Sequence, residues 1–219
     1  DPNTLHVNTV EHHAYFIPYQ QNETALSGKR EQSDYFTLLN GQWDFNYFQS
    51  YHDLPDNFLD IAFEHKIPVP ANWQNHGFDH HHYTNINYPF PFDPPFVPHQ
   101  NPCGVYHRTL QLTPKSNKRY LLNFEGVDSC LFVYVNKQFV GYSQISHSTS
   151  EFDVSDYLQV GTNHLTVVVL KWCDGSYLED QDKFRMSGIF RDVYLLEREH
   201  NYLQDFFIQY ELAHELPHA

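Results

Sequence analysis

From Val105 onward the chain alternates short apolar runs with turn residues, and this spacing constrains the fold more than any other feature. Six strands are expected, at residues 105–112, 119–124, 131–135, 139–142, 165–172 and 193–197. Turns are predicted at 136–137 and 161–163, and residues 150–161 indicate a helical turn, with Ser155 or Asp156 as its cap. Short strands without helical periods between them predict an all-β fold, an antiparallel jelly-roll sandwich.

The first third of the chain carries a different pattern. Residues 1–35 are polar and aperiodic, which predicts an extended N-terminal arm lying over its own domain or a neighbouring subunit. Its expected anchors are apolar: Leu5, Val7, Tyr15, Phe16 and Ile17. The β pattern starts at Phe36, where Asn40 and Gly41 separate two apolar runs and predict a β-hairpin.

Residues 76–102 are rich in proline, aromatic residues, histidine and asparagine. Six prolines between Pro89 and Pro102 forbid a helix and predict a rigid loop. Stiff backbone beside rings and amides is suited to a preorganised sugar contact. The run His80–His82 is interpreted as surface polar residues, because neighbours on a strand point to opposite sides and cannot all face one ion.

Composition narrows the class of protein. A net charge of −14 with 13 Lys and Arg argues against nucleic acid and anionic membranes as partners. No apolar run approaches the ~20 residues of a membrane span, and no secretory segment opens the chain. Three cysteines without metal-ligand spacing (Cys103, Cys130, Cys173) indicate reduced thiols in a cytoplasm. Aromatic residues at 17% suit a carbohydrate-binding protein, with a merely aromatic core as the alternative.

Residues 164–192 combine an apolar strand with a loop dense in charges and rings. The charged side chains are Lys171, Asp174, Glu179, Asp180, Asp182, Lys183, Arg185, Arg191 and Asp192. Because a solvated charge run would not need so many aromatic neighbours, we expect the loop to fold back on the protein. Its charges are predicted to be paired and aimed at a small polar target.

Three segments together resemble a known family: DGSYLEDQDKFRMSGIFRDV at 174–193, FEGVDSCLFVYVNKQFVGYSQ at 124–144 and PANWQNHGFDHHHYTNINYPF at 70–90. They are similar to the amino-terminal sugar-binding domain of family 2 glycoside hydrolases, and within that family to the large β-galactosidases. The resemblance implies a jelly-roll domain at 36–199 and the first strand of an immunoglobulin-like domain at 200–219, with a TIM barrel beyond. The chain is therefore expected to be truncated.

The resemblance also implies where catalysis occurs. Retaining glycosidases need two carboxyl groups about 5–5.5 Å apart, and Glu179, Asp180 and Asp182 could supply such a pair by spacing alone. In the family, however, the two catalytic glutamates lie in the barrel, beyond Ala219. No catalytic residue is therefore expected in this chain, which should be inactive alone. The parent enzyme, an oligomer, would hydrolyse terminal β-D-galactosides such as lactose.

Two substrate contacts follow from the resemblance. Asn85 matches an amide that reaches the galactose pocket of the barrel, and Asp182 matches a carboxylate that bonds sugar hydroxyls and ligates sodium. A carboxylate can accept from two vicinal hydroxyls, and an amide both donates and accepts. The alternatives are an Asx-turn for Asn85 and a salt bridge to Arg185 or Arg191 for Asp182.

A magnesium site is also implied. Gln144 and Asp174 match side chains that hold magnesium between the arm and the jelly roll, and hard oxygen ligands of this kind suit the ion. Of the arm ligands, Asp1 would replace an asparagine, and an upstream aspartate is missing from the chain. Asp174 as a turn-forming residue is the alternative.

Two further functions remain open at this point. The first is a free-standing carbohydrate-binding or assembly module without hydrolase activity. The second is a β-glucuronidase-like relative, which should match the YLEDQD loop less closely.

Overall fold

The chain forms fifteen strands within the residues that the computed structural model describes, 2–85, 87–179 and 182–211. They are β1 His6–Val7, β2 Phe36–Leu38, β3 Gly41–Phe48, β4 His65–Val69, β5 His82–Thr84, β6 Cys103–Leu112, β7 Lys118–Phe124, β8 Val127–Asp128, β9 Cys130–Val135, β10 Gln138–Gln144, β11 Ser150–Asp153, β12 Gly161–Leu170, β13 Lys183–Arg185, β14 Gly188–Ile189 and β15 Val193–Glu199.

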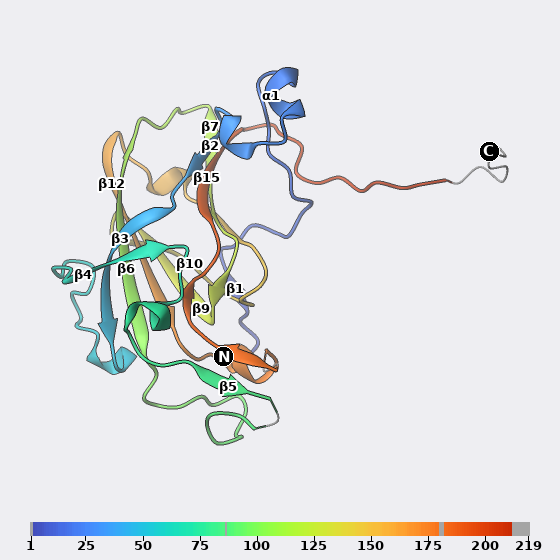
Figure 1. Cartoon of the computed structure of the whole chain (residues 1–219). Coiled ribbons are helices and arrows are strands. Elements are labelled where there is room, and N and C mark those ends of the chain that lie inside the picture. The colour runs from blue at the N-terminus through green and yellow to red at the C-terminus, as the bar shows by residue number, and fades with distance from the viewer. Residues whose placement is uncertain (1, 86, 180–181, 212–219) are drawn as a thin grey trace.

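These strands build two facing sheets and two small ribbons (Figure 1). The larger sheet has the order β1-β10-β9-β12-β6-β3-β4, and the smaller has the order β11-β7-β15-β2. The ribbons pair β13 with β5 and β14 with β8. Every pairing among these strands is antiparallel. The predicted all-β antiparallel sandwich is therefore confirmed.

Helical structure is sparse. The short helix α1 covers Asn22–Leu26, and 3-10 turns cover Arg30–Gln32, Tyr51–Asp53, Trp73–His76, Ser155–Tyr157 and Asp174–Tyr177. Across the described ranges, none of the helices has the length and hydropathy needed to cross a bilayer.

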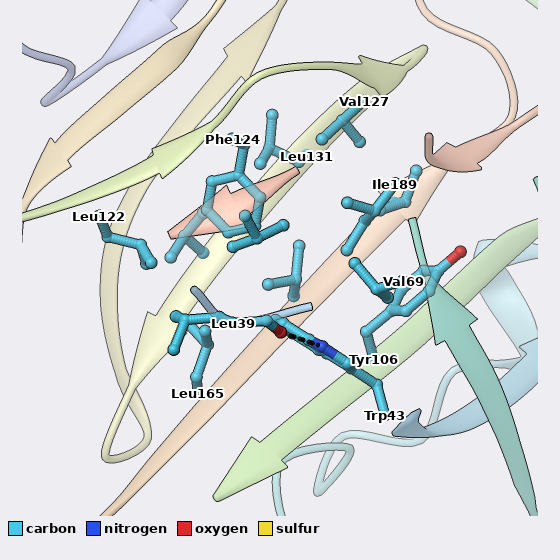
Figure 2. Close-up of a cluster of buried hydrophobic side chains, with 14 of the residues drawn as sticks. Leu39, Trp43, Val69, Tyr106, Leu122, Phe124, Val127, Leu131, Leu165 and Ile189 are labelled. Atoms are coloured by element: carbon cyan, nitrogen blue, oxygen red, sulfur yellow. Dashed lines mark hydrogen bonds between the residues drawn. The ribbon is translucent and has the colours of Figure 1, made fainter. Parts of the chain in front are cut away.

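The core lies between the two sheets (Figure 2). Trp43 and Tyr106 of the larger sheet face Leu122 and Phe124 of the smaller one, and all four are buried. The indole of Trp43 donates a 2.8 Å hydrogen bond to the carbonyl of Leu39, so its polar atom is satisfied. Full burial of such a side chain contributes about 1.5–3 kcal/mol, which makes this layer the main source of stability.

All six predicted strands of the second half are present, with changed ends. The long strand β12 starts at Gly161, inside the predicted turn, and ends at Leu170, before Trp172. Strand β11 was not predicted. The cap prediction is wrong: the turn at Ser155–Tyr157 has Val154 at its N-cap. The hydroxyl of Ser155 instead accepts a 2.8 Å hydrogen bond from the Tyr120 amide of β7.

The predicted hairpin at Asn40 and Gly41 is wrong. Strand β2 pairs with β15 in the smaller sheet, whereas β3 pairs with β4 and β6 in the larger one. The dipeptide therefore carries the chain from one sheet to the other. The Asn40 side chain donates to Asp192 at 2.8 Å and accepts from the Val193 amide at 3.0 Å, which anchors this crossing to the start of β15.

The N-terminal arm docks on the sandwich. Strand β1 pairs with β10 and forms the edge of the larger sheet, and the Val10 amide donates to Glu151 O at 2.8 Å. Farther along, the ring of His13 lies 3.0 Å from the buried Glu151 carboxylate, and Ile17 packs on the outer face of the smaller sheet. Tyr15 is 60% and Leu5 44% exposed, so the prediction that these two side chains anchor the arm is wrong.

The strand-like run at the C-terminal end does not form a strand in its described part. Residues 200–211 leave β15 as an extended segment (Figure 1). Asp205 accepts a 2.7 Å hydrogen bond from the Ala14 amide, but Phe207 and Tyr210 are exposed. A strand needs a neighbour to take up its backbone groups, and none of the described strands pairs with this segment. Residues 212–219 lie outside the described part.

Candidate functional site

The ribbon of β5 and β13 brings together two distant segments of the chain. Thr84 is opposite Lys183, so Asn85, which follows β5, and Asp182, which precedes β13, lie at the same end of the ribbon. The hydroxyl of Tyr83 donates a hydrogen bond to the Asp182 carboxylate. The two residues predicted to contact substrate are therefore neighbours in the structure, and both are exposed.

Tyr83 is the member of this site that the sequence reasoning missed. Its hydrogen bond to Asp182 raises the pKa of the phenol, and a weaker opposing effect comes from a hydrogen bond with Asn85. The phenol therefore stays protonated and holds the carboxylate from one side. Alternate residues of a strand point to the same face, and Tyr83 lies two positions before Asn85. This spacing could have identified Tyr83 from the sequence.

The two faces of the ribbon differ in character. Tyr83 and Phe184 are opposite each other on the exposed face, with ring centres 5.6 Å apart. His82 and Arg185 are paired on the other face and approach the ring of Trp172. The exposed rings beside a carboxylate offer both elements of sugar recognition, a flat apolar surface for C–H groups and an acceptor for hydroxyls.

A buried ion pair links the ribbon of β5 and β13 to the larger sheet. Lys171 follows the end of β12, and its ammonium forms an ion pair with Asp79 in the loop that leads into β5. The same ammonium lies 3.2 Å from Nε2 of His82 and 5.2 Å from the ring centre of Trp172. Burial, followed by the charge of Lys171, lowers the pKa of His82, so its ring stays neutral.

The three consecutive histidines differ in their surroundings, although the ring centres of His80 and His82 lie 4.5 Å apart. His80 lies 3.2 Å from an Asp79 carboxylate oxygen and is mostly exposed, whereas His81 packs edge-on against Phe184. His82 is half-buried against Lys171, so the interpretation of all three as surface residues is wrong for it. The described residues contain no cluster of three or more histidine, cysteine or acidic side chains placed to hold a metal.

The prediction that the charges of this loop are paired is confirmed for Lys171, which forms an ion pair with Asp79, and for Asp192, which forms one with Arg30. It is wrong for Arg185 and Glu179, which bond to uncharged groups. Arg185 donates to the carbonyls of Glu179 at 2.6 Å and Ser176 at 3.2 Å, because this turn leaves its own carbonyl groups without strand partners. The Glu179 carboxylate accepts from the amide and hydroxyl of Ser146, both at 2.8 Å. Asp180 lies outside the described residues.

The salt-bridge alternative for Asp182 is not what the structure contains. Arg185 bonds to backbone carbonyls, and Arg191 donates to the carbonyl of His147 at 3.3 Å. Within the described ranges the Asp182 carboxylate has Tyr83 as its partner instead of a cation. The carboxylate is therefore available to accept hydroxyl groups.

Of the two predicted magnesium ligands, Gln144 lies next to the arm and beside both chain neighbours of Asp174, Cys173 and Gly175. Gln144, at the end of β10, lies with its Oε1 3.2 Å from Sγ of Cys173, the residue before Asp174. Its backbone amide donates to Leu5 O at 3.2 Å and its side-chain amide to Thr4 O at 3.4 Å. Oxygen donors from one amide and one carboxylate fit magnesium, which commonly keeps several waters beside one or two carboxylates. Asp1 lies outside the described residues.

The family model and the curated relatives that match this chain agree with each other. The family model described as "Glycosyl hydrolases family 2, sugar binding domain" matches residues 36–199. A "Beta-galactosidase" of Actinobacillus pleuropneumoniae is 95% identical over 219 residues, which are 100% of this chain and 22% of that protein. One of Staphylococcus xylosus is 46% identical over 213 residues, 96% of this chain and 21% of that protein. The chain thus spans about a fifth of the length of these curated relatives.

Solved structures support the fold. A β-glucuronidase of an uncultured Clostridium matches with a TM-score of 0.54 and 22% identity, covering 75% of this chain and 29% of that one. The β-glucuronidase of Faecalibacterium prausnitzii matches with a TM-score of 0.55 and 19% identity, covering 76% and 32%. At this identity the likeness concerns the sandwich alone. The family match, which covers every described strand except β1, shows that this chain belongs to glycosyl hydrolase family 2 through its sugar-binding domain.

Proposed function

We propose that this chain is the non-catalytic sugar-binding part of a β-galactosidase that hydrolyses terminal β-D-galactosides such as lactose. The observation that carries the proposal is the meeting of Asn85, Tyr83 and Asp182 at one exposed end of the ribbon. The names of the two curated relatives support the same activity. The catalytic glutamates would belong to a TIM barrel outside these residues, and residues 200–219 would begin an intervening immunoglobulin-like domain.

In this proposal each polar group has a defined task. The Asp182 carboxylate accepts hydrogen bonds from vicinal sugar hydroxyls, and the Asn85 amide both donates and accepts. Tyr83 orients the carboxylate by donating to one of its oxygens. Asp182 would also hold sodium, and Gln144 with Asp174 would hold magnesium beside the arm. Such hard cations supply positive charge to oxygen ligands when bound.

The test is Asp182→Asn in the full-length enzyme. The change keeps the shape of the side chain but removes its charge, so the hydrogen bonds to sugar hydroxyls should weaken. We expect kcat/KM to fall at least about tenfold, equivalent to about 1.4 kcal/mol. The loss should shrink for galactosides that lack the hydroxyl held by Asp182, because that contact is then already missing.

Two further variants sharpen this test. Tyr83→Phe removes only the hydroxyl that orients the carboxylate, so its loss should be smaller, about 0.5–1.5 kcal/mol, and should follow the same substrate dependence. Asp156→Asn, at an exposed position in the 3-10 turn at Ser155–Tyr157, is the matched control and should leave kcat/KM unchanged. If Asp182→Asn lowers activity and melting temperature with no dependence on the substrate hydroxyl, Asp182 has a structural role.

The affinity of the chain itself for galactose separates this proposal from a free-standing binding module. Two or three side chains supply only a few hydrogen bonds, each with a net contribution of about 0.5–1.5 kcal/mol. Calorimetry on residues 1–219 should therefore give a dissociation constant of about 1 mM or weaker. A micromolar constant would contradict the dependence on a barrel and favour the free-standing module.

A further inference from the structure

Two of the three cysteines meet where the arm crosses the larger sheet. Cys130 opens β9, with Leu170 of β12 opposite it on one side and Gln144 of β10 on the other. Three residues beyond Leu170, the chain folds back and brings Cys173 next to the start of β9, so that the side chains of Cys173 and Cys130 line the same cavity.

Other contacts place Cys173 independently. Its Sγ lies 3.2 Å from Oε1 of Gln144, the cross-strand partner of Cys130, and 3.9 Å from the carbonyl of Ser129, the residue before Cys130. The carbonyl of Ser129 and the side chain of Gln144 therefore both place the thiol of Cys173 beside Cys130. Cys103 is separate, because it packs with Val105 and Val168 in an apolar cluster on the outer face of the larger sheet.

The thiol pair adjoins a cavity of about 730 Å³. Both cysteines line it, together with Phe132, Tyr142 and Trp172. Other parts of its wall include the arm, at Pro2, Thr4 and Val7, and the proline-rich loop at 95–97. Although Cys130 is 1% and Cys173 7% exposed, a small reagent would reach them through this space once the arm moves.

We propose that Cys130 and Cys173 form an oxidisable dithiol that is shielded by the N-terminal arm. The oxidant is a small-molecule disulfide. The thiolate of the more accessible Cys173 attacks one sulfur of the reagent, which forms a mixed disulfide and releases one thiol. Cys130 then gives up its proton and attacks Sγ of Cys173, which closes the protein disulfide and releases the second thiol. One reagent disulfide is reduced for each protein disulfide formed.

Closure of this bond would change the junction between the arm and the sheet. The thiol of Cys173 could no longer donate to Gln144, whose side chain and backbone bond to Thr4 and Leu5. Cys173 also precedes the turn Asp174–Tyr177, so its displacement toward Cys130 would shift this turn relative to Gln144. The oxidation state of the pair would thus be coupled to docking of the arm.

The experiment treats the reduced chain, under native conditions, with 2-hydroxyethyl disulfide. The expected product has lost two hydrogen atoms by intact mass, and a non-reducing digest links the peptides of Cys130 and Cys173. Cys103→Ser should give the same link at the same rate. Cys130→Ser should stop at a mixed disulfide on Cys173, because the resolving thiol is missing. If Cys130→Ser does not fold, Cys130→Ala is the substitute.

The role of the arm is tested by Val7→Asp, which places a charge in the wall of the cavity. Opening of the arm should become more frequent, and the link between the two cysteines should form at least about tenfold faster. Exposed Val160→Asp is the control and should not change the rate. The proposal is overturned if Cys103 reacts first, if the native chain forms only mixed disulfides, or if Val7→Asp leaves the rate unchanged.

Discussion

Replacing Asp79 with asparagine should destabilise the chain by about 3–5 kcal/mol, since the substitution leaves the ammonium of Lys171 buried without its counter-charge. The two side chains are only 7% and 4% exposed. Asparagine keeps the shape of the residue and tolerates its positive φ of 63°, so backbone strain does not enter. The free energy of unfolding, measured by urea denaturation, checks this expectation.

The chain offers matched controls for this prediction. Lys137 and Asp60 form an ion pair in which both side chains are more than half exposed, so Asp60→Asn should cost at most about 1 kcal/mol. The double change Asp79→Asn with Lys171→Met removes both charges and should recover most of the lost stability. If the double variant is no more stable than Asp79→Asn, the loss arises from packing and the interpretation as a buried charge is wrong.

Asp128→Asn should stabilise the chain at neutral pH. Asp128 lies in β8 and is buried near β13. Burial raises the pKa of its carboxyl from 3.8 to about 6, although the charges of Arg185 and Lys183 favour the ionised form. At about 1.4 kcal/mol per pKa unit, keeping this group ionised costs the folded state about 3 kcal/mol above pH 7. Asparagine removes that cost, so the free energy of unfolding should rise by about this amount at pH 8.

The pH dependence gives this prediction its sign. The folded chain binds the proton of Asp128 more tightly than the unfolded chain does. Below pH 3.8 the carboxyl is protonated in both states and does not lower the free energy of unfolding, which then falls as the pH rises through about 6. The gain from Asp128→Asn should therefore vanish near pH 4. Asp56→Asn, at an exposed position, should show no such trend. An equal gain at pH 4 and pH 8 would mean that the charge is not responsible.

The two predictions concern groups near the candidate site, but only the ion pair of Lys171 and Asp79 positions it. Lys171 ties the segment before β5 to the end of β12, and Asp128 lies close enough to Arg185 and Lys183 of β13 to feel their charges. If the ribbon holds Asn85 and Asp182 as proposed, Asp79→Asn should also weaken the sugar contact, whereas Asp128→Asn should not.

Much of the architecture is local and can be predicted from the sequence. The turn at Asn136 and Lys137 joins β9 to β10, and both residues have the positive φ that such tight turns require, 49° and 66°. Six strands of the second half were found by their apolar runs, because each must bury at least one face, whereas the short strands β8, β11, β13 and β14 were missed. Asn85 and Asp182 were singled out as candidate substrate contacts by their motifs, which depend on residue identity alone.

Tertiary structure decided what local pattern could not. The Asn40–Gly41 dipeptide has the sequence of a hairpin, but β2 and β3 belong to opposite sheets, since pairing depends on which distant strands offer an open edge. The partners of the loop charges, Asp79 for Lys171 and Ser146 for Glu179, are far away in the chain. A hydrogen bond or ion pair is specified by the position of both groups, and only the folded sandwich brings those positions together.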